Sequence, residues 1–439
     1  MNTAGTRAAH MESALQAAGR GVVKGSKTGL MATLAFLLVS LIFPRMAAEP
    51  PTAAPVLAAR QFIVLNAAGG AVSTAYFEAV RREFPASRQT PTRVGIAGIF
   101  SYLQAPPEKV RASLAEFLRL AVQYDMPVVV QLDGEQWWEG RPDLWNWWDP
   151  KRPGFNPNNR ANVEWSGWGP QHAVRIAWRN WGQQIRVLPP PNLMSPVYRA
   201  ACHTEMGALI PMILRWWQAL PPARRDLLVG IKLGWESSVG VNSWYYPNGN
   251  ALADRPATED PKTGLKNNEL PARGVAAIGY AATTQVRLKT KGELTEQDLA
   301  VIAWRHLEDL CRVASQLGVP RNRLFTHGAA WKDEELLYHA AVNRFSCPGW
   351  SFYKYANDPA KDAGVRKALA RSDAPCWAAV EWLGGGPTVD SWRKALSNTL
   401  ADPRCRFLTI YNWESIEKNT AALQAIRDVC AIPEVKPKS

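Results

Sequence analysis

The sequence predicts an α/β protein built as a single (β/α)8 TIM barrel. Short apolar segments rich in β-branched and aromatic residues alternate with amphipathic segments from residue 62 to the end of the chain. Neither an internal repeat nor a change of composition marks a second domain. The first strand-to-helix turn, NAAGGAVS at 66–73, lacks the Gly-x-Gly-x-x-Gly spacing of a dinucleotide-binding sheet. An open doubly wound sheet is therefore the weaker alternative.

Eight segments have the length and composition of buried parallel strands. They are FIVLN (62–66), RVGIAGIF (93–100), PVVVQLD (127–133), VGIKLGW (229–235), RLFTHG (323–328), WSFYKY (350–355), WAAVEW (377–382) and RFLTIYNW (406–413). Eight parallel strands with helices between them are the number that closes into a barrel.

Two of the intervening segments carry clear helix signals. Residues 106–125 open with proline and place Val110, Leu114 and Phe117 on one face. Residues 295–318 begin with a Thr-x-x-Asp cap and end at glycine. Both segments are expected to be crossover helices on the outside of the barrel.

Two connections are too long to be simple turns: about 134–170 after the third strand and about 236–294 after the fourth. Loops of this length in a compact domain are usually functional. Both follow the carboxyl ends of their strands, where (β/α)8 barrels assemble their active sites. We therefore expect the site to lie between these two loops.

The N-terminus reads as a targeting segment. Residues 29–43 form an uncharged apolar run that Arg20, Lys24 and Lys27 precede. The expectation is export to the periplasm or the extracellular space by a signal peptide; the alternative is an uncleaved membrane anchor. A Pro/Ala linker would then lead to the barrel.

The domain organisation follows from these signals. Residues 1–60 are expected to be the leader and linker, residues 61–432 the catalytic barrel, and residues 433–439 a tail. The composition, 47% hydrophobic and 20% charged, is that of a globular protein. The formal net charge is +13, but no run of lysine or arginine indicates a nucleic-acid partner. The charge favours a solvated basic surface, and an acidic substrate is the alternative.

The six cysteines and six histidines lack metal-ligand spacing, so no metal or cofactor is expected. In an oxidising compartment an even number of cysteines suggests disulfides. The hypotheses are a Cys347–Cys376 bond, because both residues precede neighbouring strands, and a companion Cys405–Cys430 bond.

Acidic residues stand where several strands end. Glu236 follows the fourth strand, Glu381 closes the seventh, Glu414 follows the eighth, and Asp133 closes the third. Cleavage of a glycosidic bond needs two carboxyl groups, one protonated and one ionised. Strands four and seven face each other across a barrel mouth, which favours Glu236 and Glu381 as that pair. Glu414 is instead expected to serve a helix entry, and Asp133 either contacts substrate or braces the loop.

This arrangement resembles the clan of (β/α)8 glycoside hydrolases whose acid/base glutamate ends strand four and whose nucleophile ends strand seven. The resemblance covers residues 61–430 at the level of the fold pattern. It implies that Glu236 in GWES is the acid/base and Glu381 in VEWL the nucleophile. The segment of glutamate followed by WYYP is also similar to the inverting β-amylase type of barrel. Retention and inversion therefore stay open at this point.

The same resemblance implies roles for other residues. Trp413 in YNWE corresponds to the tryptophan that floors the sugar subsite, and Tyr353, or alternatively Tyr355, to the tyrosine that hydrogen-bonds the nucleophile. His327 would be a polar contact in the site.

One position departs from the clan. The asparagine that usually precedes the acid/base, and that touches the sugar's 2-hydroxyl, is here Trp235. Asn242 or Asn412 is expected to take that contact, or the chain belongs to a divergent family.

The long loops are unusually aromatic. Nine of the twenty tryptophans lie between Trp137 and Trp181. Indole and phenol rings stack on sugar C–H faces, so Trp137, Trp138, Trp244 and Tyr245 are candidate sugar platforms. The competing interpretation is a satellite core under a long loop, and about half of these rings are expected to be buried for that reason.

The sequence thus predicts a secreted glycoside hydrolase that acts on a poly- or oligosaccharide through two glutamates. Burial beside Trp235 is expected to raise the pKa of Glu236, and a tyrosine hydrogen bond to keep Glu381 ionised. The alternatives are a non-catalytic carbohydrate-binding or cell-envelope protein and a transglycosylase that uses the same residues.

Overall fold

The computed structural model describes residues 60–67, 73–85, 90–175, 177–180, 184–239, 243–244, 278–329, 335–353 and 355–431. Residues Ala58–Ser439 form one compact unit. The expected leader and tail, and the apolar run at 29–43, lie outside the described residues. Within the described residues, no helix has both the length and the apolar character to cross a membrane.

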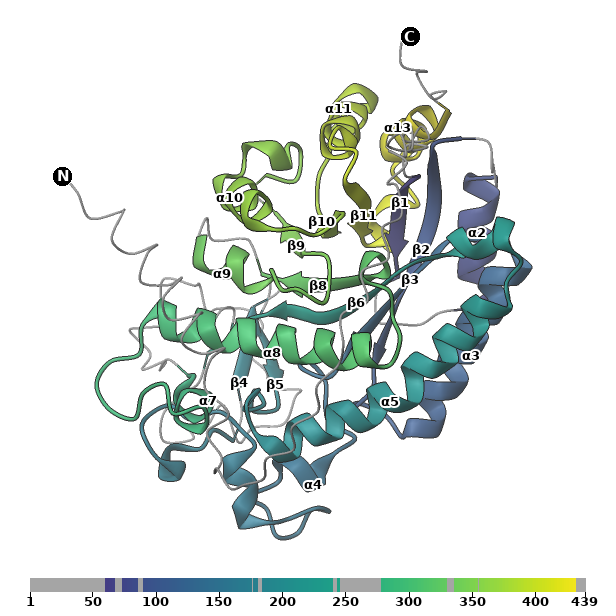
Figure 1. The fold of residues 1–439 in the computed structure, drawn as a ribbon. Coiled ribbons are helices and arrows are strands. Elements are labelled where there is room, and N and C mark those ends of the chain that lie inside the picture. The colour runs from purple at the N-terminus through teal and green to yellow at the C-terminus, as the bar shows by residue number, and fades with distance from the viewer. Residues whose placement is uncertain are drawn as a thin grey trace, which may run out of the picture. The chain divides into compact units, whose positions relative to one another are not determined.

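Eight parallel strands form a closed barrel in the order β1-β11-β10-β9-β8-β6-β3-β2 (Figure 1). Their bounds are β1 Gln61–Asn66, β2 Thr92–Ser101, β3 Val128–Asp133, β6 Leu228–Ser237, β8 Leu324–Gly328, β9 Gly349–Phe352, β10 Trp377–Trp382 and β11 Cys405–Tyr411. The fold class and all eight expected strands are confirmed. Three strands have carboxyl ends two or more residues from the expected position: β9 stops at Phe352, β11 stops at Tyr411, and β6 runs through Glu236 to Ser237.

Helices cover the outside of the barrel (Figure 1). Their bounds are α2 Thr74–Glu83, α3 Pro107–Gln123, α5 Pro196–Ala219, α8 Glu296–Gln316, α9 Glu335–Ala340, α10 Ala363–Arg371, α11 Val389–Leu400, α12 Trp413–Ile416 and α13 Thr420–Ala431. The two helices with clear sequence signals are confirmed. Helix α8 starts with a capping box in which Thr295 and Asp298 each bond the other's backbone N–H.

The two long connections meet in a small antiparallel sheet that the sequence did not predict. Strands β4 (Ala177–Asn180) and β5 (Gln184–Val187) come from the connection after β3, and β7 (Ser243–Trp244) comes from the one after β6. The sheet order is β5-β4-β7. The short helices α4 (Pro142–Trp145) and α7 (Tyr280–Gln285) lie in the same two insertions, on the same side of the barrel as β4 and β5 (Figure 1). The insertions therefore build one structure rather than two independent loops.

An apolar cluster lies inside the barrel. It consists of fully buried side chains: Phe62, Val64, Ala97, Val129, Val229, Phe325, Cys347, Ala378, Val380 and Phe407. Burying these side chains is the main favourable contribution to closing the barrel.

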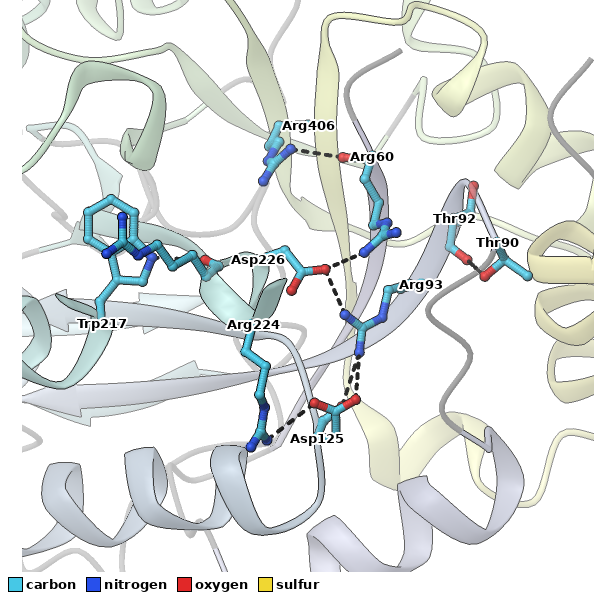
Figure 2. A network of polar contacts seen from close by, with 10 residues as sticks. Arg60, Thr90, Thr92, Arg93, Asp125, Trp217, Arg224, Asp226 and Arg406 are labelled. Carbon is cyan, nitrogen blue, oxygen red and sulfur yellow. Dashed lines mark hydrogen bonds and ion pairs between the residues drawn. The ribbon is translucent and has the colours of Figure 1, made fainter. Parts of the chain in front are cut away.

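Arginines and aspartates surround the amino ends of the strands (Figure 2). Asp226 accepts from Arg60 and, at 2.7 Å, from Arg93 Nη1. Asp125 lies 3.2 Å from Arg224 Nη2. This network ties β1, β2 and the segments before β3 and β6 together.

Candidate active site

Two glutamates from facing strands meet at one tyrosine hydroxyl. Glu236 in β6 is 7% exposed, and Glu381 in β10 is 4% exposed. The hydroxyl of Tyr353, just after β9, lies 2.7 Å from Glu236 Oε1 and 2.6 Å from Glu381 Oε1. The two carboxylate oxygens are therefore at most 5.3 Å apart, the sum of those two distances. The structure brings together the expected pair and the tyrosine named with it.

An irregularity in β6 aims Glu236 into the barrel mouth. In the pairing of β6 with β8, Leu233 faces Thr326 and Ser237 faces Gly328, so Gly234–Glu236 stand opposite His327 alone. Gly234 has φ 81° and Glu236 has φ 50°. A bulge of this kind redirects a side chain at the rim of a barrel. A positive φ at a glutamate is uncommon, and such strain is concentrated at functional sites.

Strand β10 has a smaller irregularity at the corresponding place. Ala379 faces Trp350 while Glu381 faces Ser351, so Val380 is an additional residue on β10. Val380 belongs to the barrel's apolar cluster, and Glu381 still reaches Tyr353 at the mouth. Because of the bulge, the successive residues Val380 and Glu381 can both point toward the barrel interior.

His327 supports Glu381 from β8. Its Nε2 atom lies 2.8 Å from Ser351 Oγ and 3.5 Å from Glu381 Oε2. Burial, and next the positive charge of Lys232, hold the pKa of His327 well below its ordinary value, so the ring is neutral. Its side chain is fully buried, so it contacts Glu381 rather than solvent.

The two carboxyls cannot both be ionised at low energetic cost. Burial, and then the charge of Glu236, raise the pKa of Glu381 to about 8, against the Tyr353 hydrogen bond and the charge of Lys232. The expected tyrosine hydrogen bond to Glu381 is present, but its effect is outweighed. A hydroxyl has a single hydrogen, so Tyr353 can donate to one carboxylate while it accepts from the other in its acid form. The geometry therefore suits a pair that holds one proton.

Asp133 closes β3 and braces the loop that follows. Its Oδ1 accepts from the backbone N–H of Glu135 at 2.9 Å, and its Oδ2 accepts from Ser101 Oγ at 2.9 Å. Burial raises its pKa to about 6. Glu135 in turn accepts from Ser237 Oγ at 2.6 Å and lies 3.0 Å from His306 Nε2. This buried network, which the sequence reading did not single out, holds the residue next to Glu236.

A hollow of about 430 Å³ opens at the ends of β2, β6 and β11. It is lined by Ile99, Phe100, Ser101, Gln104, Ala105, Lys109, Val110, Ser113, Trp137, Trp235 and Tyr411. Trp137 is half-buried, so part of its ring is open to a ligand. Tyr411 was not a sequence candidate; burial, and next the charge of Glu381, raise its pKa above the ordinary value. Its position two residues before Trp413 was the available signal.

Two of the expected platforms lie in the core. Trp138 is 1% exposed, and its Nε1 donates to Pro189 O at 3.1 Å. Trp413 is 4% exposed and packs edge-on against Tyr76 at 6.3 Å between ring centroids. Since β11 ends at Tyr411, Trp413 starts helix α12 and faces the core. Neither ring is among the residues that line the hollow.

The other candidates are placed only in part. Tyr355 is half-buried in the segment after β9, and Asn412 accepts at Oδ1 from Asn66 Nδ2 at 2.7 Å. Asn242 and Tyr245 lie outside the described residues, and for Trp244 only the backbone, in β7, is described. Their roles stay predictions.

Glu414, the acid that follows the eighth strand, is exposed in the first turn of α12. The Tyr353 hydroxyl contacts Glu381 and Glu236, not Glu414. An acid near a helix N-terminus is stabilised by the helix dipole. This placement agrees with the expectation that Glu414 serves the helix entry.

The cysteines are thiols in this structure. The sulfurs of Cys347 and Cys376 are 3.2 Å apart, in contact but longer than a disulfide bond. The sulfur of Cys405 instead contacts Phe407 O, and its expected bond to Cys430 is not formed. Among the described residues no group of three or more histidine, cysteine and acidic side chains could hold a metal ion.

Comparisons with known proteins find similar solved structures but assign no family to this chain. No family model matches the sequence, and no curated protein matches it. A broad-specificity endoglucanase of subfamily GH5-4 from an uncultured bacterium is 7% identical with a TM-score of 0.39, over 82% of this chain and 85% of that one. A glycoside hydrolase family 5 enzyme from Prevotella bryantii is also 7% identical, with a TM-score of 0.38 over 84% and 95%.

A third structure is the catalytic domain of a GH26 endo-beta-1,4-mannanase from a Bacillus species. It is 9% identical with a TM-score of 0.40, over 84% of this chain and 85% of that one. No residue role follows from similarity at this level. The roles assigned to this chain rest on its own closed barrel and on the contacts of Glu236 and Glu381.

Proposed function

We propose that this protein is a glycoside hydrolase that cleaves the glycosidic bonds of a poly- or oligosaccharide, with Glu236 as acid/base and Glu381 as nucleophile. The observation that carries the proposal is the Tyr353 hydroxyl in contact with both carboxyls, at 2.7 Å and 2.6 Å. Both acids stand at the carboxyl ends of barrel strands, where this fold places its chemistry. Buried acids with a strongly perturbed pKa are typical of active sites.

The spacing of the carboxyls favours retention of configuration. Retaining glycosidases hold the two groups about 5–5.5 Å apart, and inverting ones about 6.5–9.5 Å apart to leave room for a water molecule. The facing oxygens are at most 5.3 Å apart, which is closer than the inverting range. Glu381 can then attack the anomeric carbon directly.

The surroundings of the two acids favour different charge states. Glu381 receives the Tyr353 hydrogen bond, lies 3.5 Å from His327 Nε2 and interacts with Lys232 more strongly than Glu236 does. These contacts favour the negative charge on Glu381. The charge of Glu236 is one cause of the raised pKa of Glu381, so a proton on Glu236 removes that cause and makes Glu381 easier to ionise. The proposal therefore places the shared proton on Glu236, beside Trp235, where a neutral acid is less costly to bury.

The reaction would proceed in two displacements. Glu381 forms a bond to the anomeric carbon while Glu236 gives its proton to the departing glycosidic oxygen. Glu236, now ionised, takes a proton from water, the oxygen of that water bonds to the anomeric carbon, and the bond to Glu381 breaks. Trp137 and Tyr411 in the lining of the hollow offer rings against which a neighbouring sugar can stack.

Export is part of the proposal, and it rests on the uncharged run at residues 29–43 and the basic residues before it. An uncleaved anchor would place the same barrel at a membrane surface. Fractionation of cells that express the full chain, followed by N-terminal sequencing of the mature protein, separates the two.

The test is turnover of a panel of aryl glycosides and polysaccharides, with the configuration of the first product read by proton NMR. We expect a retained anomer. Glu236→Ala should keep activity on aryl glycosides with good leaving groups, and azide should raise it further by forming the glycosyl azide. An inverted first product would contradict retention. A glycoside as the main product, rather than the free sugar, would identify a transglycosylase. No turnover across the panel would leave the carbohydrate-binding alternative.

A further inference from the structure

A lysine is buried inside the barrel beneath the two glutamates. Lys232 lies in β6, faces Gln131 of β3 in register and is 3% exposed. Its Nζ atom donates to the carbonyl oxygen of Val380 at 3.1 Å. Val380 is the residue before Glu381, so this bond links β6 to β10 directly below the proposed nucleophile. An ammonium group in a barrel core is costly unless nearby charges compensate it.

The groups that act electrostatically on Lys232 come from four strands. They are Glu236 on β6, Asp133 on β3, His327 on β8 and Glu381 on β10. Glu381 has the largest of the favourable effects, followed by Glu236 and then Asp133. His327 is neutral, so it adds no positive charge. Lys232 is thus placed to stabilise the ionised form of Glu381 more than that of Glu236.

We infer that Lys232 is a positioning residue that lowers the cost of ionising Glu381 and thereby favours the shared proton on Glu236. The inference rests on the proposed function, because it decides which of the two carboxyls is the acid. A positive charge in a low-dielectric site favours the ionised form of the acid with which it interacts more strongly, here Glu381. Burial lowers the pKa of Lys232 to about 8, while the three acids act in the opposite direction, so the ammonium form persists at neutral pH.

A purely structural role would make a different prediction. If Lys232 only braces β6 against β10, the bond to Val380 O is what matters, and any donor of suitable length would serve. Lys232→Gln keeps an N–H donor and removes the charge, whereas Lys232→Arg keeps the charge. Lys232→Met removes both the donor and the charge with little change of volume. The three variants therefore separate charge from hydrogen bonding.

The direct test is the titration of Glu381 by carbon-13 NMR of labelled glutamate carboxyls in the Glu236→Gln background. This background removes the coupled carboxyl. Adding Lys232→Gln or Lys232→Met should raise the pKa of Glu381 by about one unit or more. Lys232→Arg should hold it near the starting value. The matched control is Lys361→Gln at a side chain that is 73% exposed, which should shift the pKa by less than about 0.2 units because water and salt screen it.

The activity readout uses the intact protein with Glu236 in place. The acid limb of the kcat/KM profile should move to higher pH in Lys232→Gln and Lys232→Met, with kcat at pH 6 reduced about 10- to 100-fold. The KM should change little. Thermal unfolding monitors the fold, and the Met variant, whose own side chain adds no polar atom to the barrel interior, remains available if the Gln variant does not fold.

The outcomes separate this inference from the proposed function. An unchanged Glu381 titration in both neutral variants would overturn the inference even if the wild-type protein hydrolyses glycosides normally. A shifted titration in a protein that turns over no glycoside would support the electrostatic role and remove the proposed function. An equal loss in Lys232→Arg and Lys232→Met would show a steric role and also overturn the inference.

Discussion

The two ends of the barrel both bury charge, but they balance it differently. At the amino end Asp226 contacts Arg60 and Arg93, and Asp125 contacts Arg93 and Arg224, so each carboxylate has two cations (Figure 2). At the carboxyl end, in the described part of the chain, the ratio is reversed, because several acids share one cation. Glu236, Glu381 and Asp133 all act on one ammonium group.

The difference shows which end is organised for cohesion and which for chemistry. Paired charges at the amino end hold the starts of the strands together. At the carboxyl end the described acids outnumber the compensating charge; burial, and next the charge of Glu236, raise the pKa of Glu381 to about 8. Proteins usually tolerate such imbalance only where it serves function. Substitutions at the carboxyl end should therefore cost activity, and substitutions at the amino end should cost stability.

The largest expected effect is on turnover. Glu381→Gln should lower kcat by about 10⁴-fold or more, since it removes the nucleophile. The free energy of unfolding should stay the same or rise, because the variant removes a buried acid next to Glu236. Steady-state kinetics on an aryl glycoside and thermal unfolding measure the two quantities. Glu414→Gln is the control and should retain near-normal kcat; the opposite pattern would assign the nucleophile to Glu414 in α12.

The amino end should respond in the opposite way. Asp226→Asn should lower the free energy of unfolding by about 3 kcal/mol, because it leaves Arg60 and the buried Arg93 without their shared partner. The folded fraction should keep its kcat. Chemical denaturation and active-site-normalised kinetics check both. A loss of kcat without a loss of stability would contradict the claim that the amino end contributes to stability and the carboxyl end to activity.

Two tryptophans, one in α12 and one in the insertion after β3, sharpen the same comparison. Trp413→Ala should cost about 3 kcal/mol or more of stability, since the ring is 4% exposed and packed in the core. Trp137→Ala should leave stability nearly unchanged and raise KM on a polymeric substrate about 10-fold, because a platform outside the reacting centre supplies uniform binding. Equal losses of kcat in both variants would contradict this and support the expected role of Trp413 in the sugar subsite.

The smallest effect concerns a buried acid away from both ends. Glu164, 1% exposed, accepts from the backbone N–H groups of Ala281 and Ala282 in α7, and burial raises its pKa from 4.5 to about 8. Between those values the folded protein binds a proton that the unfolded chain does not, so stability falls as pH rises. Glu164→Gln should remove this fall and stabilise the protein at pH 8 by about 1–2 kcal/mol relative to the wild type. Urea unfolding from pH 5 to pH 8 measures how the free energy of unfolding depends on pH. If this dependence is the same in Glu164→Gln as in the wild type, the prediction is contradicted.

The barrel could be predicted because buried parallel strands have a strong signal in sequence. Segments such as PVVVQLD and WAAVEW are apolar on both faces and flanked by amphipathic helices, which leaves few other folds. The positions of Glu236 and Glu381 followed from strand ends alone. The β5-β4-β7 sheet could not be predicted, because its pairing joins insertions far apart in the chain and its strands are two to four residues long.

Where the placement of a site residue differs from the sequence expectation, the difference comes from an element boundary or from burial. Strand β11 ends two residues earlier than expected, at Tyr411. Trp413 therefore faces the core, and Tyr411 lines the hollow. The positive φ of Glu236 depends on a register shift against β8 that no local pattern encodes. Lys232 was visible as a charge in an apolar strand, but its role depends on carboxylates from other strands that only the closed barrel brings near.

The most direct test of the central claim is to trap the covalent intermediate on the nucleophile. A 2-deoxy-2-fluoro glycoside of the sugar that the panel identifies, with a good leaving group, should inactivate the enzyme by accumulating the glycosyl-enzyme. Mass spectrometry of proteolytic fragments should then find the sugar on Glu381, and Glu381→Gln should take up no label. A label on Glu414, or turnover with inversion and without any labelled peptide, would contradict the account.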